Sequence, residues 1–81
     1  MTEKDFYLEM NKRLQSWGIS QSRIGYWTFI RVSYRKYKNP SMKLINDGGK
    51  TNYKPYFKIL SSIINRGKYK DYSNFISQVL I

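Results

Sequence analysis

Apolar residues recur at helical spacing in the first part of the chain. Thr2 can cap a helix, and Gly18 suits the left-handed conformation that often ends one. Lys12, Arg13 and Gln15 are expected to lie off the apolar positions. The pattern therefore predicts a helix over residues 2–17 with one apolar stripe, made of Phe6, Met10, Leu14 and Trp17.

A second helix is predicted to begin at Ser20, which is a good N-cap. Ile19, Ile24 and Trp27 are then expected to face the core. Residues 28–34 fit two patterns. Their β-branched and aromatic side chains alternate with polar ones, as in a half-exposed strand. As a helix they would separate an apolar face from a basic stripe of Arg31, Arg35 and Lys38, and we favour the helix for that reason.

The second half of the chain predicts further short helices. Asn39-Pro40-Ser41 breaks the preceding helix, and Asn46-Asp47-Gly48-Gly49 is a strong turn signal. That turn fits either the end of a short helix or a hairpin around residues 43–53. An apolar stripe after Pro55 predicts a helix that ends near Gly67, and a last helix capped by Asp71 follows. We expect a mainly α domain over residues 1–81, with four to five helices and with or without a small β-hairpin.

The composition narrows the chemistry. The chain has 81 residues, no cysteine, no histidine and five acidic residues. Disulfides and thiolate metal sites are excluded, and the commonest general base is missing. We therefore expect no enzyme activity, no cofactor and no metal. No apolar run is long enough for a membrane span or a signal peptide, so a cytoplasmic location is expected.

The charge indicates the class of partner. Fifteen lysines and arginines give a formal net charge of +10, and residues 10–46 contain no acid. A basic surface of this density favours a polyanion such as nucleic acid. Six of the tyrosines lie within two residues of a lysine or arginine along the sequence, namely Tyr34, Tyr37, Tyr53, Tyr56, Tyr69 and Tyr72. They fit core positions with hydroxyls reaching the surface, which we favour, or stacking on unpaired bases.

Residues 18–27, Gly-Ile-Ser-Gln-Ser-Arg-Ile-Gly-Tyr-Trp, resemble a known motif. They are similar to the turn and recognition-helix start of phage repressor and Cro-like helix-turn-helix proteins. Gly18 corresponds to the turn glycine, and Ile19 and Ile24 to buried residues of the motif. Lys38-Asn39-Pro40-Ser41 also resembles a segment of that family, so the likeness covers residues 10–41. A second register, in which Ser20-Gln21 opens the family's earlier helix, also fits.

The resemblance implies double-stranded DNA as the partner. Polar residues on the first turn of a recognition helix read base edges, where glutamine suits adenine and arginine suits guanine. Cations farther along contact phosphates. The expected base contacts are Gln21, Ser22, Arg23 and Tyr26, and the expected phosphate contacts are Lys12, Arg13, Arg31, Arg35, Lys36 and Lys38.

The function expected from these features is regulation of transcription or recombination in a phage or other mobile element. A homodimer is expected, because one recognition helix reads few base pairs. Its surface would be the apolar end of the chain, with Phe75, Val79 and Leu80. Two alternatives remain open. One is an inhibitor of a host enzyme such as a nuclease, and the other is a binder of single-stranded nucleic acid or RNA.

Overall fold

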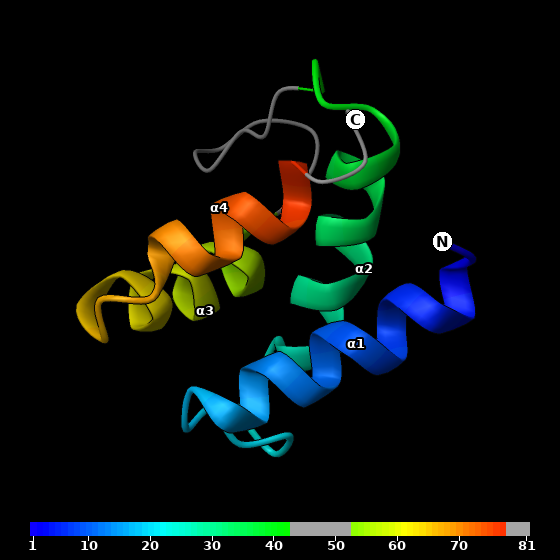
Figure 1. The fold of residues 1–81 in the computed structure, drawn as a ribbon. Coiled ribbons are helices and arrows are strands. Elements are labelled where there is room, and N and C mark those ends of the chain that lie inside the picture. Colours follow the sequence, from blue (N-terminus) through cyan, green and yellow to red (C-terminus); the bar gives the residue numbers. More distant parts are fainter. Residues whose placement is uncertain (43–52, 78–81) are drawn as a thin grey trace.

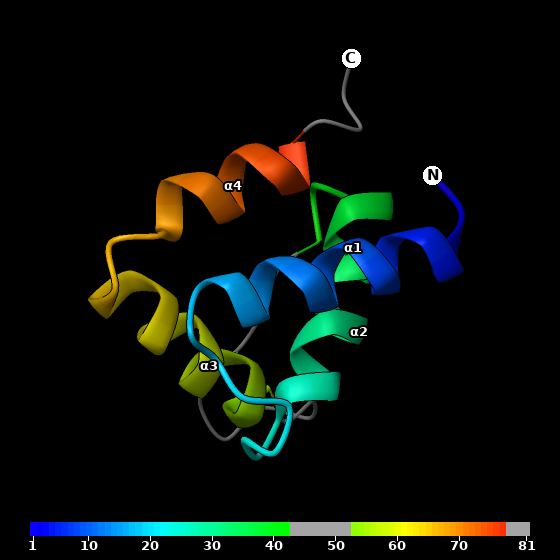
Figure 2. The same ribbon diagram turned by 60° about the horizontal axis from the view of Figure 1, so that its bottom comes forward.

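The computed structural model describes residues 1–42 and 53–77. These residues form an all-α domain of four helices, and none of them belongs to a strand. The helices are α1 (Glu3–Ser16), α2 (Tyr26–Lys38), α3 (Lys54–Asn65) and α4 (Tyr69–Ser77). Figures 1 and 2 show α1 crossing α2 on one side, while α3 and α4 lie beside α2 on another. Within the described ranges, no helix is long and apolar enough to cross a bilayer.

The prediction for α1 is confirmed. The Thr2 hydroxyl accepts a hydrogen bond from the Asp5 amide at 3.1 Å, which caps the first turn. Gly18 closes the other end with a φ of +83°. Phe6, Met10 and Leu14 are fully buried, and Phe6 packs against the rings of Tyr34, Tyr37 and Phe75. One apolar stripe thus joins α1 to α2 and α4.

The predicted start of the second helix at Ser20 is wrong, because α2 begins at Tyr26. Gly25 precedes it with a φ of +86°, outside the helical region, so no helix can run through this position. A Cβ at Gly25 would lie 2.5 Å from the Pro55 Cβ. The Ser20 hydroxyl caps a local turn instead, accepting from the Ser22 amide at 3.2 Å.

The later start of α2 turns two predicted core residues outward. Ile24 is 80% exposed and Trp27 is 50% exposed, so the prediction that both face the core is wrong. Ile19 is buried, as expected. Gly25 sets the rotation of α2 about its axis, because the helix begins one residue after it. In this rotation Tyr26 faces the interior and Trp27 does not.

The helical interpretation of residues 28–37 is confirmed, and the strand alternative is wrong. A helix buries one continuous face of this segment against three other helices, which an isolated strand could not do. The buried residues of α2 are Tyr26, Phe29, Ile30, Val32, Ser33 and Tyr37. The turn at residues 46–49 lies outside the described residues, as does all of the proposed hairpin except Tyr53.

The last two helices are also as predicted, apart from the start of α4. Pro55 stands in the first turn of α3, and Gly67 follows its end with a φ of +72°. The final helix begins at Tyr69, two residues before the predicted cap Asp71.

Tyrosines fill much of the space between helices. Of the six tyrosines near lysines or arginines in the sequence, Tyr37, Tyr56 and Tyr72 are buried, in line with the core interpretation. Tyr34 and Tyr53 are half-buried, and Tyr69 is 49% exposed, so it is not a core residue.

Candidate nucleic-acid interface

The exposed face of α2 carries three cations and one tryptophan. Trp27, Arg31, Arg35 and Lys38 are the exposed residues of this helix, and all its other residues are buried or half-buried. Their spacing of four, four and three residues places them along one side of a helix. We call these four residues the α2 face. The helix thus presents no exposed residue other than a cation or an aromatic ring.

Among the described residues, no carboxylate forms an ion pair with the cations of the α2 face. Within residues 1–42 and 53–77, the ion pair closer than 4 Å joins Arg13 to Glu9 and involves none of them. The Lys38 ammonium lies 5.9 Å from the centre of the Tyr34 ring, at the edge of the face. The guanidinium charges therefore remain available to an anionic ligand.

Tyr7 of α1 borders the α2 face. Its ring centre is 6.4 Å from that of Tyr34. Burial and then Glu3 raise the pKa of Tyr7, whereas the positive charges of Arg31 and Arg35 oppose that rise. Half-buried tyrosines thus line one edge of the basic face.

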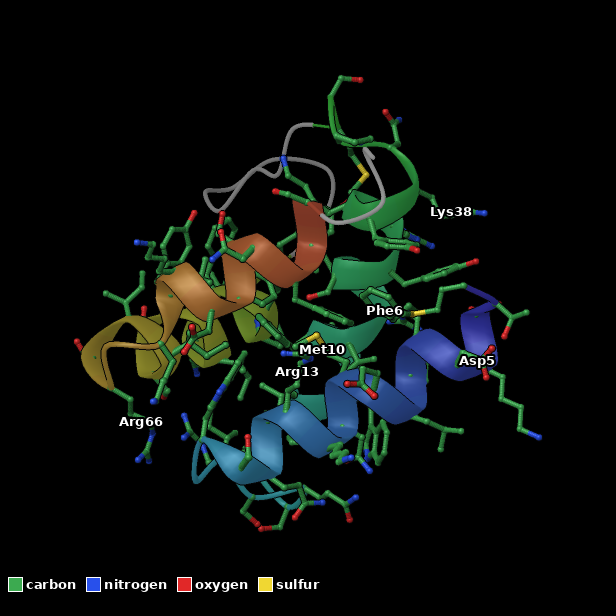
Figure 3. All side chains as sticks on the ribbon, in the orientation of Figure 1. Asp5, Phe6, Met10, Arg13, Lys38 and Arg66 are labelled. Carbon is green, nitrogen blue, oxygen red and sulfur yellow. The ribbon has the colours of Figure 1, made fainter. Side chains whose placement is uncertain are left out.

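Three of the six predicted phosphate contacts lie elsewhere. The Lys36 ammonium donates a hydrogen bond to the Met42 carbonyl at 2.9 Å, on the other side of α2. The Arg13 guanidinium packs 4.4 Å from the centre of the Phe75 ring, next to Glu9. Lys12 is exposed on α1. In Figure 3, Lys38 extends away from the protein, while Arg13 points inward beside Met10.

The predicted base contacts do not lie on a helix. Gln21, Ser22 and Arg23 belong to the connection between α1 and α2. Gln21 donates to the Asn11 side chain at 2.9 Å, and Arg23 donates to the Ser62 hydroxyl at 3.0 Å. The connection is therefore held against α1 and α3. The prediction that these residues open a recognition helix is wrong, because α2 begins after them.

Tyr26 is the fourth predicted base contact, and its side chain is inside the protein. It is 1% exposed, and its hydroxyl donates to Asn11, with oxygen distances of 2.6 Å to the side chain and 3.1 Å to the carbonyl. Burial raises the pKa of Tyr26. A ligand cannot reach this side chain without unfolding the start of α2.

Trp27 is the residue of the α2 face that the sequence did not assign to a site. Its place one helical turn before Arg31 continues the spacing of the basic stripe, and that spacing is visible in the sequence. We assigned Trp27 to the core because it follows Ile24 at a three-residue spacing and falls where the resembled family often has an apolar residue. Trp27 is exposed instead, because α2 begins just after the left-handed Gly25 and Tyr26 takes the buried position.

Phe75 does not form the predicted dimer surface. Its side chain is 2% exposed and packs on Phe6, inside this domain. Val79 and Leu80 lie outside the described residues. A homodimer, if it forms, uses another surface or only the end of the chain.

Other parts of the molecule offer weaker sites. A cavity of about 200 Å³ lies between α2, α3 and α4, and Lys36, Tyr56 and Tyr72 are among its lining residues. It is smaller than the roughly 300 Å³ at which ligand pockets begin. A larger hollow of about 520 Å³, lined by Glu3, Lys4, Tyr7 and Leu8, lies open on the surface of α1 and encloses a ligand poorly. Within the described residues, no three carboxylates lie close enough together to hold a metal ion. The α2 face is therefore the strongest candidate site.

No protein-family model, curated protein or solved structure matches this chain.

Proposed function

We propose that this protein binds nucleic acid, with the phosphate backbone lying along the α2 face. The observation that carries the proposal is the make-up of that face. Three of its four residues are cations that make no ion pair in the described part of the chain. A surface helix normally mixes acidic and basic residues on its exposed side. An exposed side without any acid suits a polyanion.

The spacing of the cations fits a row of phosphates. Arg31 and Lys38 are seven residues apart, which is about 10.5 Å along a helix that rises 1.5 Å per residue. Phosphates of one strand of duplex DNA rise by about 3.4 Å each along its axis, and they are farther apart than this rise because the strand winds around the axis. The row of three cations is therefore long enough to contact more than one phosphate of a strand. Contacts of this kind fix the position of the ligand and carry no sequence information.

The proposal does not include base reading by Gln21, Ser22 and Arg23. Two of these side chains hold the connection in place through Asn11 and Ser62. Regulation in a phage or other mobile element is compatible with backbone binding, and it is the process that the helix-turn-helix resemblance suggests.

The test is a pair of charge-matched double variants. Arg31→Ala with Arg35→Ala removes two cations of the α2 face, and Lys4→Ala with Lys12→Ala removes two exposed cations of α1. Binding of a random-sequence duplex is measured between low and physiological salt. The first variant should lose affinity, and its slope of log K against log salt should become shallower by about 1.8. The second should resemble the wild type.

Equal losses in both variants would mean that net charge alone drives binding, and the assignment to α2 would be wrong. If the wild type bound neither duplex nor single-stranded DNA at low salt, the proposed function would fail. An acidic protein surface, as in the inhibitor alternative, would then be the next ligand to test.

A further inference from the structure

Trp27 gives one end of the α2 face an apolar, aromatic surface. The ring is 50% exposed, although tryptophan is a residue that folded proteins usually bury. Ile24, three residues earlier, is 80% exposed. Arg31 follows Trp27 by one helical turn, about 6 Å along the axis. The face thus changes from apolar to cationic along its length.

The backbone that carries Trp27 is held rigidly. Gly25 packs so closely on Pro55 that a methyl group at residue 25 would overlap it. Tyr26, next to Trp27, is fixed by the hydrogen bonds from its hydroxyl to Asn11. The Tyr26 ring also makes an edge contact with the Trp27 ring, with centroids 5.1 Å apart. A ring held in this way loses little further freedom when a ligand stacks on it.

We propose that the α2 face takes single-stranded nucleic acid, with an unpaired base stacked on Trp27 and the adjoining phosphates on Arg31, Arg35 and Lys38. This inference rests on the proposed function and names its ligand. An intact duplex keeps its base faces inside the stack and shows only their edges in the grooves. A single strand offers base faces and phosphates side by side, and proteins bind it with aromatic rings beside cations.

The experiment follows the fluorescence of Trp27. The Trp17→Phe variant leaves Trp27 as the only tryptophan of the chain. This variant is titrated with an oligothymidylate and, separately, with a blunt duplex that carries the same number of phosphates. Stacking should quench the fluorescence with the single strand, saturably and more strongly than with the duplex.

Affinity measurements use two further variants in the wild-type background. Trp27→Ala should weaken single-strand binding by about 5-fold to 150-fold, the range expected for loss of one base–aromatic stack, and should change duplex binding little. Trp27→Phe should keep part of the affinity, because phenylalanine also stacks. The matched control is Leu8→Ala, which removes an apolar side chain that is 60% exposed on α1 and should leave binding unchanged.

Each outcome separates this inference from the proposed function. If Trp27→Ala weakened both ligands equally, or neither, the single-strand inference would be overturned. The backbone proposal would still stand if the Arg31→Ala, Arg35→Ala variant lost affinity. If the wild type bound neither ligand, both proposals would fail together.

Discussion

Gly25 determines which side chains of α2 face outward. It combines a left-handed backbone with a close approach to Pro55, and either feature alone would favour glycine. Because α2 begins just after it, Gly25 also sets the rotation of the helix. That rotation buries Tyr26 and exposes Trp27.

Gly25→Ala should therefore destabilise the protein strongly. The left-handed conformation costs about 1–2 kcal/mol in an L-residue, and the contact with Pro55 adds about 1–3 kcal/mol of overpacking. Gly67→Ala is the control, since Gly67 has a φ of +72° but no atom within 4 Å of an added Cβ. Urea unfolding should show the larger loss for Gly25→Ala. Equal losses would mean that the contact with Pro55 is unimportant.

The sequence predicted the ends of a helix correctly where neighbouring residues alone determine them. Thr2 and Gly18 were identified as the ends of α1 because a cap and a left-handed glycine act within a few residues. The prediction failed at Ser20 and Gly25. Ser20 has the chemistry of an N-cap, but a helix that began there would have to continue through Gly25. Gly25 is left-handed and packs on Pro55, thirty residues later in the chain, and one sequence does not reveal that contact.

At the scale of elements, α2, α3 and α4 are joined by a chain of buried hydroxyl groups. Ser33 of α2 lies 2.8 Å from the Tyr72 hydroxyl of α4, which lies 3.0 Å from the Tyr56 hydroxyl of α3. Burial raises the pKa of Tyr72 well above 10, and the negative charge of an ionised Tyr56 adds to the rise. Burial also raises the pKa of Tyr56. Both hydroxyls therefore stay protonated in the folded protein under ordinary conditions.

The protein should lose stability as the pH rises above about 10. Below that pH the tyrosines are protonated in the folded and unfolded states alike, so their contribution is fully present. Above it the unfolded chain releases protons that the folded protein retains, which favours unfolding. Urea unfolding at pH 8 and pH 11 should show this decline. A rise in stability over the same interval would contradict the raised pKa values of the buried tyrosines.

Tyr72→Phe tests the same cluster. It should lower stability at pH 8 by about 1–3 kcal/mol, because Ser33 and Tyr56 lose a buried partner. It should also reduce the alkaline decline, although Tyr56 and Tyr26 maintain part of it. Tyr69→Phe, at an exposed position of the same helix, is the control and should cost less than about 0.5 kcal/mol at pH 8.

The elements themselves were largely predictable. The apolar stripe of α1 identifies its buried face, and the basic stripe of α2 was recognised as a helical pattern. The stripe expected after Pro55 includes Tyr56 and Ile63, which are buried, but also Ile64, which is 53% exposed. The exposed positions of Arg31, Arg35 and Lys38 were predicted, whereas that of Trp27 was not. The spacing of Trp27 to Arg31 was visible in the sequence, but Trp27 was assigned to the core together with Ile24.

At the scale of the whole molecule, the charge opposes folding. A net charge of +10 occupies a body of 31 × 27 × 22 Å, and the unfolded chain would hold the same charges farther apart. At about 0.01 M ionic strength the Debye length is about 30 Å, so the cations repel each other across the whole protein. At about 0.15 M it falls to about 8 Å.

The thermal midpoint should therefore rise when sodium chloride is added from about 0.01 M to about 0.15 M. A variant with Lys4→Gln and Lys12→Gln has two fewer cations, so its midpoint should begin higher at low salt and rise less. Scanning calorimetry or circular dichroism measures both. A midpoint that falls with salt would show that attractive charge pairs outweigh the repulsion.

The position of α2 between the other helices determines which parts of the protein can unfold locally. Since α2 packs against α1, α3 and α4, its backbone amides should open only when the whole domain unfolds, whereas the first turn of α1 can open by local fraying. The α2 face would keep its shape through such partial openings. A ligand held on α2 would therefore not dissociate because the first turn of α1 has frayed, and its residence time would be set by its own contacts.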